Sequence, residues 1–148
     1  MKKLFTLFLF SSLFLGLSNI TYAQEDYSAL NVFIRFGNNS KINAHYEIPV
    51  TKNITISPSV VLPFNFDYVS LGGRADYYFD SLFKLQEPWD IWGGVDAGFI
   101  VGGDSGDDDF SLNLHAGVEY KITETFGIIG EFGGGTTSFG GIGVGIHF

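Results

Sequence analysis

The sequence predicts an all-β protein, an eight-stranded antiparallel up-and-down transmembrane β-barrel preceded by a cleaved signal peptide. Three observations predict this fold. Apolar and polar residues alternate with a period of two from about residue 30 onward, which is the period of a strand rather than a helix. The alternating segments are about ten residues long, which suits tilted strands that cross a bilayer. One face of these segments is almost wholly apolar, whereas the other carries most of their charged side chains.

The composition of the 148 residues agrees with one such domain and excludes several other classes of protein. The chain is 45% hydrophobic and 17% aromatic but only 16% charged, which excludes a disordered chain and a coiled coil. It contains no Cys, so it has no disulfide scaffold and no thiolate metal site. The net charge of −8 argues against nucleic acid as a partner. The Gly-rich stretch 133–145 lacks the Lys and the strand–helix context of a phosphate-binding loop, so we expect no nucleotide binding. We also expect no cofactor.

The amino terminus has the pattern of an export signal. A cationic start over Met1 to Lys3 precedes an apolar run from Leu4 to Leu17, and the small-residue pattern Thr21-Tyr22-Ala23 follows. The alternative is a membrane anchor, but the apolar run is shorter than the ~20 residues that a spanning helix needs. We therefore expect a signal peptide over 1–23 and a barrel domain over 24–148.

Eight alternating segments follow, separated by residues that favour turns. The segment 41–50 shows the pattern best, and the sixth segment repeats it, because its even-numbered positions from Phe110 to Tyr120 are apolar and its odd-numbered positions are polar or Gly. Pro58 falls inside the third segment, where its missing N–H predicts a bulge or a local break in the ladder. The predicted strands are 30–37, 41–50, 54–62, 68–79, 89–102, 110–120, 126–134 and 138–148.

The distribution of charge decides between a soluble β-protein and a membrane barrel. In the fifth segment Asp90 and Asp96 share one face, and apolar residues such as Val95 and Phe99 share the other. A dry protein core would bury such carboxylates without partners at high cost. A barrel with a lipid-facing wall and a polar lumen satisfies both faces, and its closure leaves no strand edge in hydrocarbon. A soluble periplasmic β-protein is the alternative.

Aromatic residues at one set of strand ends agree with the membrane barrel. In an up-and-down barrel these ends lie at the same rim, where aromatic side chains form a girdle at the membrane surface. The girdle residues are Tyr77, Phe79, Trp89, Tyr120, Phe126 and Phe148.

Two stretches resemble a known family. The last segment, Gly141 to Phe148, alternates apolar residues and ends on Phe148, and it resembles the carboxy-terminal signal by which the barrel-assembly machinery recognises outer-membrane proteins. The hairpin from Leu114 to Phe132 is similar to the small OmpA/OmpX/opacity-type barrels. The resemblance implies a bacterial outer-membrane protein with both termini in the periplasm. Its partners would be outer-membrane lipid, lipopolysaccharide and the assembly machinery, and we expect a monomer. No catalytic motif accompanies the resemblance.

The predicted lumen is narrow and acidic. An eight-stranded barrel has an interior just wide enough for side chains to fill. Register is counted from the turns by pairing Val101 with Phe110 and Tyr120 with Phe126. The expected inward-facing ionisable residues are Arg35, Arg74, Glu47, Asp76, Asp90, Asp96, Glu119, Glu131, His45, His115 and His147.

That register predicts a polar band at mid-depth. It places Asp96 opposite His115 and His115 opposite Glu131, with Arg74 one strand away from Asp96. The band has three interpretations: a hydrogen-bonded plug, a narrow water path that favours cations, and an Asp–His catalytic pair. No Ser nucleophile with an obvious elbow accompanies the third interpretation.

An acidic stretch over 103–109 is a second candidate site. Asp104, Asp107, Asp108 and Asp109 could gather a hard cation or bridge the cations of lipopolysaccharide. Their spacing does not match a helix–loop–helix calcium loop, and a solvated loop tip is the alternative.

Together these observations predict an integral outer-membrane barrel, not an enzyme, with a structural or surface-interaction role and a lumen filled by polar side chains. The alternative is a narrow, weakly cation-selective channel for ions or small solutes. A lipid-modifying outer-membrane enzyme is the third hypothesis.

Overall fold

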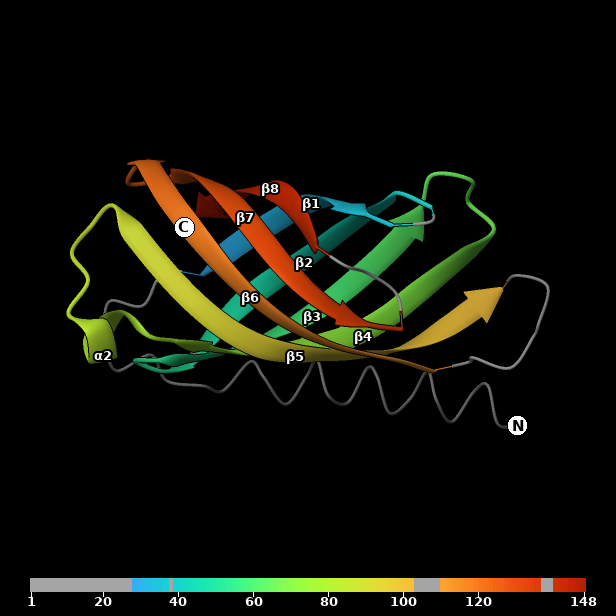
Figure 1. Cartoon of the computed structure of the whole chain (residues 1–148), viewed down its shortest axis with the longest axis horizontal. Coiled ribbons are helices and arrows are strands. Elements are labelled where there is room, and N and C mark those ends of the chain that lie inside the picture. Colours follow the sequence, from blue (N-terminus) through green and yellow to red (C-terminus); the bar gives the residue numbers. More distant parts are fainter. Residues whose placement is uncertain (1–27, 38, 103–109, 137–139) are drawn as a thin grey trace.

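The computed structural model describes residues 28–148 except 38, 103–109 and 137–139, and the expected signal peptide lies outside them. The described residues form a closed antiparallel barrel whose strands follow one another around the wall in chain order (Figure 1). The predicted fold is therefore confirmed. The elements are β1 (Ala29–Phe36), β2 (Lys41–Thr51), β3 (Ile54–Pro63), β4 (Tyr68–Tyr78), α2 (Asp80–Phe83), β5 (Trp89–Gly102), β6 (Phe110–Thr123), β7 (Phe126–Gly135) and β8 (Gly140–His147).

In the part of the chain that the structure describes, no helix is long and apolar enough to cross a membrane.

The two ends of the barrel differ. At the terminal end, which we define as the end where β1 begins and β8 finishes, the short helix α2 lies in the connection between β4 and β5 (Figure 1). The girdle residues lie at this end, and the ring centroids of Trp89 and Tyr120 are 4.8 Å apart. We call the opposite end the loop end.

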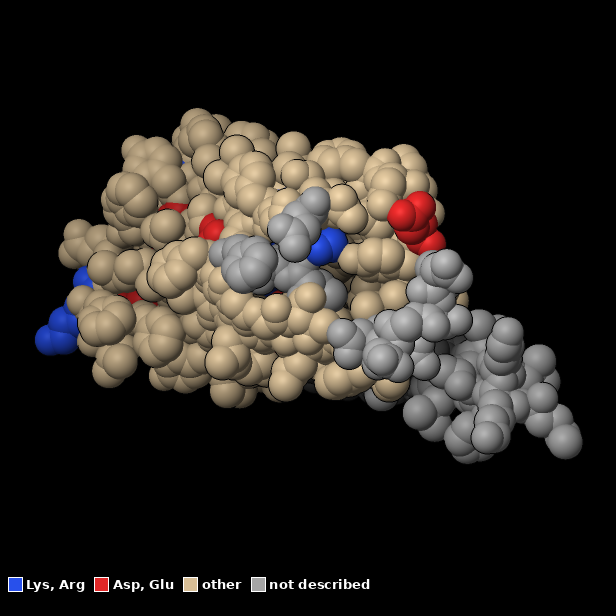
Figure 2. Space-filling view, turned by 45° about the vertical axis from the view of Figure 1, so that its right-hand side comes forward, with Lys and Arg blue, Asp and Glu red and all other residues tan. Residues whose placement is uncertain are grey.

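The wall of the barrel is apolar outside and polar inside. Along β6 the side chains alternate between exposed and buried, so that Leu114 is 63% exposed and the adjacent Asn113 only 2%. Figure 2 shows one flank covered mostly by uncharged side chains. Hydrophobic residues fully buried among the described residues are few: Ala29, Phe33, Trp92 and Ile129. This inversion of an ordinary protein core is what a strand period of two produces when lipid surrounds the barrel.

The register predicted for two strand pairs is wrong by two residues. Phe110 pairs with Phe99 rather than Val101, so Asp96 lies opposite Asn113 and not opposite His115. The physical reason is that β5 continues to Gly102, beyond its last pairing with β6 at Phe99, whereas β6 begins at its last paired residue, Phe110.

The same error occurs between β6 and β7. Tyr120 pairs with Ile128 rather than Phe126, and His115 therefore lies opposite Gly133 instead of Glu131. Here β6 continues to Thr123, and a register shift between Lys121 and Thr123 takes up the extra length. A shift of two residues preserves the face on which each side chain lies, because the side-chain period of a strand is two.

Pro58 produces a local break rather than a bulge. The β2–β3 ladder keeps His45 opposite Ser59 and Ile48 opposite Ile56, and the pairs between them are missing while the register is unchanged. This is the loss expected where a proline has no N–H to donate to the neighbouring strand. The register shift of this strand pair lies near the turn, between Pro49 and Thr51.

Glycine allows the adjacent strands β4 and β5 to approach closely on the lumen face. Gly72 lies opposite Gly98, and a Cβ added to Gly72 would lie only 2.2 Å from the backbone oxygen of Ala97. The adjacent Gly73 has more room, because a Cβ there would meet nothing nearer than the Ser57 oxygen at 3.7 Å.

Substitution of these two neighbours tests the packing. We expect Gly72→Ala to lower the free energy of unfolding by about 1–3 kcal/mol, because the clash is with backbone that cannot turn aside. The matched control Gly73→Ala carries the same chemical change and should not be destabilising. The measurement is guanidinium unfolding in detergent micelles, and equal destabilisation by the two variants would contradict the close approach.

Candidate functional site

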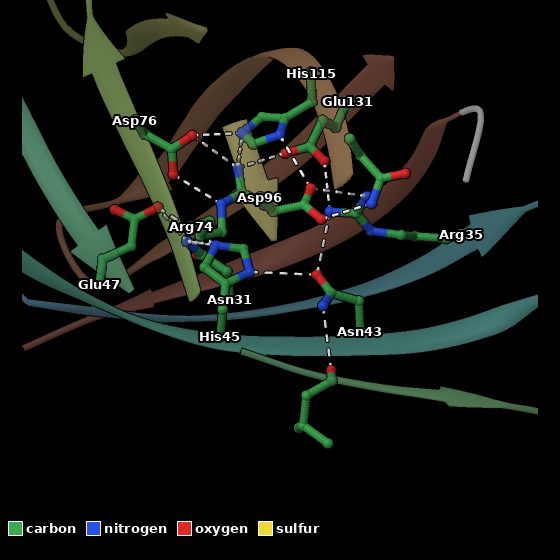
Figure 3. A network of polar contacts seen from close by, with 12 residues as sticks. Asn31, Arg35, Asn43, His45, Glu47, Arg74, Asp76, Asp96, His115 and Glu131 are labelled. Atoms are coloured by element: carbon green, nitrogen blue, oxygen red, sulfur yellow. Dashed lines mark hydrogen bonds and ion pairs between the residues drawn. The ribbon is translucent and has the colours of Figure 1, made fainter. Parts of the chain in front are cut away.

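The centre of the lumen is a network of charged side chains around Arg74 (Figure 3). Arg74 points inward from β4 and is 4% exposed. Its Nε donates to Oδ2 of Asp76 at 2.7 Å, and its Nη2 donates to Oε2 of Glu131 at 2.8 Å. The same Nη2 lies 2.7 Å from Nε2 of His115. One guanidinium thus joins side chains from β4, β6 and β7.

A second arginine holds the other side of Glu131. Nη2 of Arg35, on β1, donates to Oε1 of Glu131 at 2.7 Å and to Oδ1 of Asn43 at 3.3 Å. Both oxygens of the Glu131 carboxylate are therefore occupied, each by a different arginine. The backbone partners of Glu131 are Gly117 and Gly141, which have no side chains to compete for this part of the lumen.

His115 lies between two carboxylates. Its Nε2 contacts Oδ1 of Asp76, and its Nδ1 is 3.3 Å from Oδ2 of Asp96. Asp96 also accepts a hydrogen bond of 2.7 Å from Nδ2 of Asn113, its partner across the ladder. Within the described part of the chain, the polar contacts of His115 are thus with carboxylates and a guanidinium, and not with a hydroxyl that it could activate as a nucleophile.

The structure brings the residues of the expected band together, but their strand register and their side-chain partners differ from those predicted. Arg74 and Asp96 are backbone partners, as counted from the turns, but Arg74 bonds Asp76, Glu131 and His115 rather than Asp96. The predicted band does not include Asp76 and Arg35. The alternation of the sequence places both residues in the lumen. That they belong to the central network follows only from the observed register and from the length of the arginine side chains.

A second cluster lies nearer the terminal end. Oε1 of Glu47 accepts a hydrogen bond of 2.7 Å from Nδ2 of Asn31, and its Oε2 accepts one of 2.7 Å from the Tyr78 hydroxyl. Nε2 of His45 is 3.5 Å from the same carboxylate. Glu47 is thus held mainly by neutral donors.

A third buried carboxylate lies beside β8. Oε1 of Glu119 is 2.9 Å from Nε2 of His147. Added Cβ atoms at Gly127 and Gly145 would collide with this carboxylate, which therefore occupies the space that the missing side chains leave.

An apolar cluster fills part of the lumen. Phe33, Trp92 and Ile129 pack together, with Tyr78 against them. The ring centroids of Tyr78 and Trp92 are 5.7 Å apart. The polar networks and this cluster leave an interior of packed and hydrogen-bonded side chains, which is what a barrel of this size accommodates.

Of the two remaining candidate sites, the acidic stretch and the carboxy-terminal Phe148, the structure describes only the second. The acidic stretch with Asp104, Asp107, Asp108 and Asp109 lies outside the described residues. Phe148 lies at the terminal end with an exposed ring, and its N–H donates to the Ser28 carbonyl oxygen at 2.9 Å.

Comparison with known proteins gives structural but not sequence relatives. No protein-family model and no curated protein sequence matches the chain. Solved structures that are similar in fold include the following three. A de novo designed transmembrane β-barrel has a TM-score of 0.64 at 10% identity, covering 86% of this chain and all of the design.

The other two come from bacterial outer membranes. The outer membrane protein Ail of Yersinia pestis has a TM-score of 0.55 at 15% identity, over 84% of this chain and 100% of Ail. The N-terminal β-barrel domain of Pseudomonas aeruginosa OprF has a TM-score of 0.56 at 17% identity, over 82% of this chain and 97% of that domain. The chain therefore has the fold of the small eight-stranded transmembrane β-barrels found in bacterial outer membranes.

Proposed function

We propose that this chain is a non-enzymatic, integral outer-membrane protein with a structural or surface-interaction role, and that its charged network is a plug that holds the barrel rigid and closed. The observation that carries the proposal is the Glu131 carboxylate, which is bound by Arg35 on one side and Arg74 on the other. The apolar outer wall and the outer-membrane proteins of the same fold support the location.

The network connects strands that are not neighbours in the wall. Glu131 on β7 is bound from β1 and from β4, and Glu47 on β2 is bound from β4. Backbone ladders join only adjacent strands, so these contacts add links across the lumen. Buried charges are tolerated only when they are paired and hydrogen-bonded, and the charges of this network are placed to satisfy one another.

The channel is the alternative function. The lumen holds more carboxylates than arginines, which would favour cations over anions. The apolar cluster of Phe33, Trp92 and Ile129 and the cross-lumen ion pairs support closure instead, because ions would have to displace packed side chains.

The remaining parts of the proposal concern orientation and partners. We place the terminal end in the periplasm, with Phe148 as the residue that the barrel-assembly machinery recognises. The aromatic girdle would then lie at the periplasmic surface, and lipopolysaccharide would surround the loop end. We further propose a monomer that binds no nucleic acid.

Electrical recording in planar bilayers separates the plug from the channel. We expect the refolded protein to give no discrete conductance steps above a detergent-only control, because ions would have to displace the cross-lumen ion pairs and the apolar cluster. Cation-selective steps of uniform size would contradict the plug and establish the channel.

Substitution of Arg74 tests the stabilising role of the network. Arg74→Met removes a cation from Asp76 and Glu131 together, and we expect the free energy of unfolding to fall by about 3–5 kcal/mol. The matched control Lys84→Met removes a cation from an exposed position next to α2 and should change stability by less than about 0.5 kcal/mol.

A double variant keeps the result specific to charge. Adding Asp76→Asn to Arg74→Met removes the carboxylate that has lost its arginine, while Glu131 keeps its charge for Arg35, so the double variant should recover part of the loss. Guanidinium unfolding in micelles measures all of these variants. If Arg74→Met is no less stable than Lys84→Met, the network does not stabilise the barrel.

A further inference from the structure

A polar cavity opens at the terminal end of the barrel, away from the central network. Its volume is about 270 Å³. Strand residues Glu47, Thr55 and Tyr78 line it, together with Asp80 of α2 and Glu87 of the connection that follows. The cavity therefore lies between the lumen and the connection from β4 to β5.

The lining is acidic, because the carboxylates of Glu47, Asp80, Glu87 and Asp90 outnumber the basic groups of Lys52, Lys121 and His147. The imidazole of His147 is paired with Glu119, at 2.9 Å. Lys121 lies with its Nζ 2.9 Å from Asp90 and 3.9 Å from Glu87. The carboxylates of Glu47 and Asp80 are instead bound by neutral donors, since Asp80 accepts the Ile91 N–H at 3.0 Å.

A buried hydroxyl group marks the same cavity independently of the charges. Thr55 is 9% exposed, and among the residues that the structure describes its Oγ1 has no hydrogen-bond partner. Burying a hydroxyl without a partner costs free energy, so such a group is a position where a ligand or a water would be stabilising. The ring of Tyr78 and the side chain of Pro49 supply apolar surface beside it.

The charge state of Asp80 points in the same direction. Burial raises the pKa of the Asp80 carboxyl above its usual value, and the nearby Asp90 carboxylate adds to the shift. A cation bound beside Asp80 would oppose both effects, because an opposite charge favours the ionised form.

We propose that this cavity binds a small organic cation, a primary ammonium group on a short alkyl body. The ammonium would donate hydrogen bonds to the acidic lining and to Oγ1 of Thr55, and the alkyl body would lie against Pro49 and Tyr78. Among the described residues no three acidic or histidine side chains converge as metal ligands, whereas an ammonium needs only separate acceptors. This site goes beyond the proposed function and does not depend on whether the lumen conducts.

Calorimetric titration of the folded full chain in micelles tests the site. The probe is putrescine, and 1,4-butanediol and succinate match its length without its positive charge. We expect saturable binding of putrescine alone, weakened by added salt because the pairs are partly exposed. Equal heats from putrescine and butanediol, or no heat from putrescine, would overturn the proposal.

Paired variants locate the binding. Asp80→Asn with Glu87→Gln keeps an acceptor for the Ile91 N–H and removes two charges, and we expect putrescine affinity to fall about tenfold. The matched control Glu124→Gln removes an exposed carboxylate from the turn between β6 and β7, outside the cavity, and should bind as before. Equal affinity of the double variant and the control would overturn the site.

A titration of Asp80 followed by NMR spectroscopy distinguishes ligand binding from a purely structural role of this carboxylate. The carboxyl carbon signal of Asp80 should titrate at a lower pH when putrescine is present, because the bound cation favours the ionised carboxylate. A titration curve of Asp80 that putrescine leaves unchanged would contradict binding at this cavity. Electrophoresis with and without boiling confirms that each variant is folded.

Discussion

The interior of this protein depends on one carboxylate bound from two sides. Glu131 receives Arg35 through one oxygen and Arg74 through the other, and Arg74 in turn holds Asp76 and contacts His115. Because the lumen is too narrow for bulk water, these charges must satisfy one another. The same contacts reach from β1 and β4 to β7, so the pairing that makes the charges tolerable also braces the wall.

Glycine makes this arrangement possible by leaving space where long side chains must reach. Glu131 has Gly117 and Gly141 as its backbone partners, and a Cβ on Gly117 would meet the Trp92 ring at 2.3 Å. Small residues and large or charged residues thus share each level of the lumen. Glycine is therefore a packing requirement of a narrow barrel at the lumen-facing positions Gly94, Gly117, Gly127 and Gly145.

Much of the fold could be predicted from the sequence, because the strand period places each side chain on a face whatever the register. That period alone places His115, Arg74 and Glu131 in the lumen. The register itself was wrong by two residues, since turn tightness at Lys121–Thr123 and beyond Phe99 is set by local backbone geometry that residue types specify weakly. A register shift of two residues leaves every side chain on the same face, so the predicted residues still point into the lumen. They also still meet, because a guanidinium reaches beyond its nearest cross-strand neighbour.

The partnership of Asp76 with Arg74 and the cavity beside α2 could not be predicted in this way. The first depends on which of several inward carboxylates a flexible side chain meets, and the second on how the connection after β4 folds over the barrel end. Pro58 is the opposite case, because the missing N–H of a proline dictates the break in its ladder.

The central claim is that lipid covers the apolar face and the charged face is enclosed. The chain has two tryptophans that test it directly, because Trp92 is buried in the lumen and Trp89 is on the outer wall. Quenching of tryptophan fluorescence by brominated lipid chains is the measurement. In a Trp89→Phe variant the remaining Trp92 should be almost unquenched, whereas Leu114→Trp in a background with both native tryptophans replaced by Phe should be strongly quenched. Strong quenching of Trp92, or none at position 114, would contradict the account.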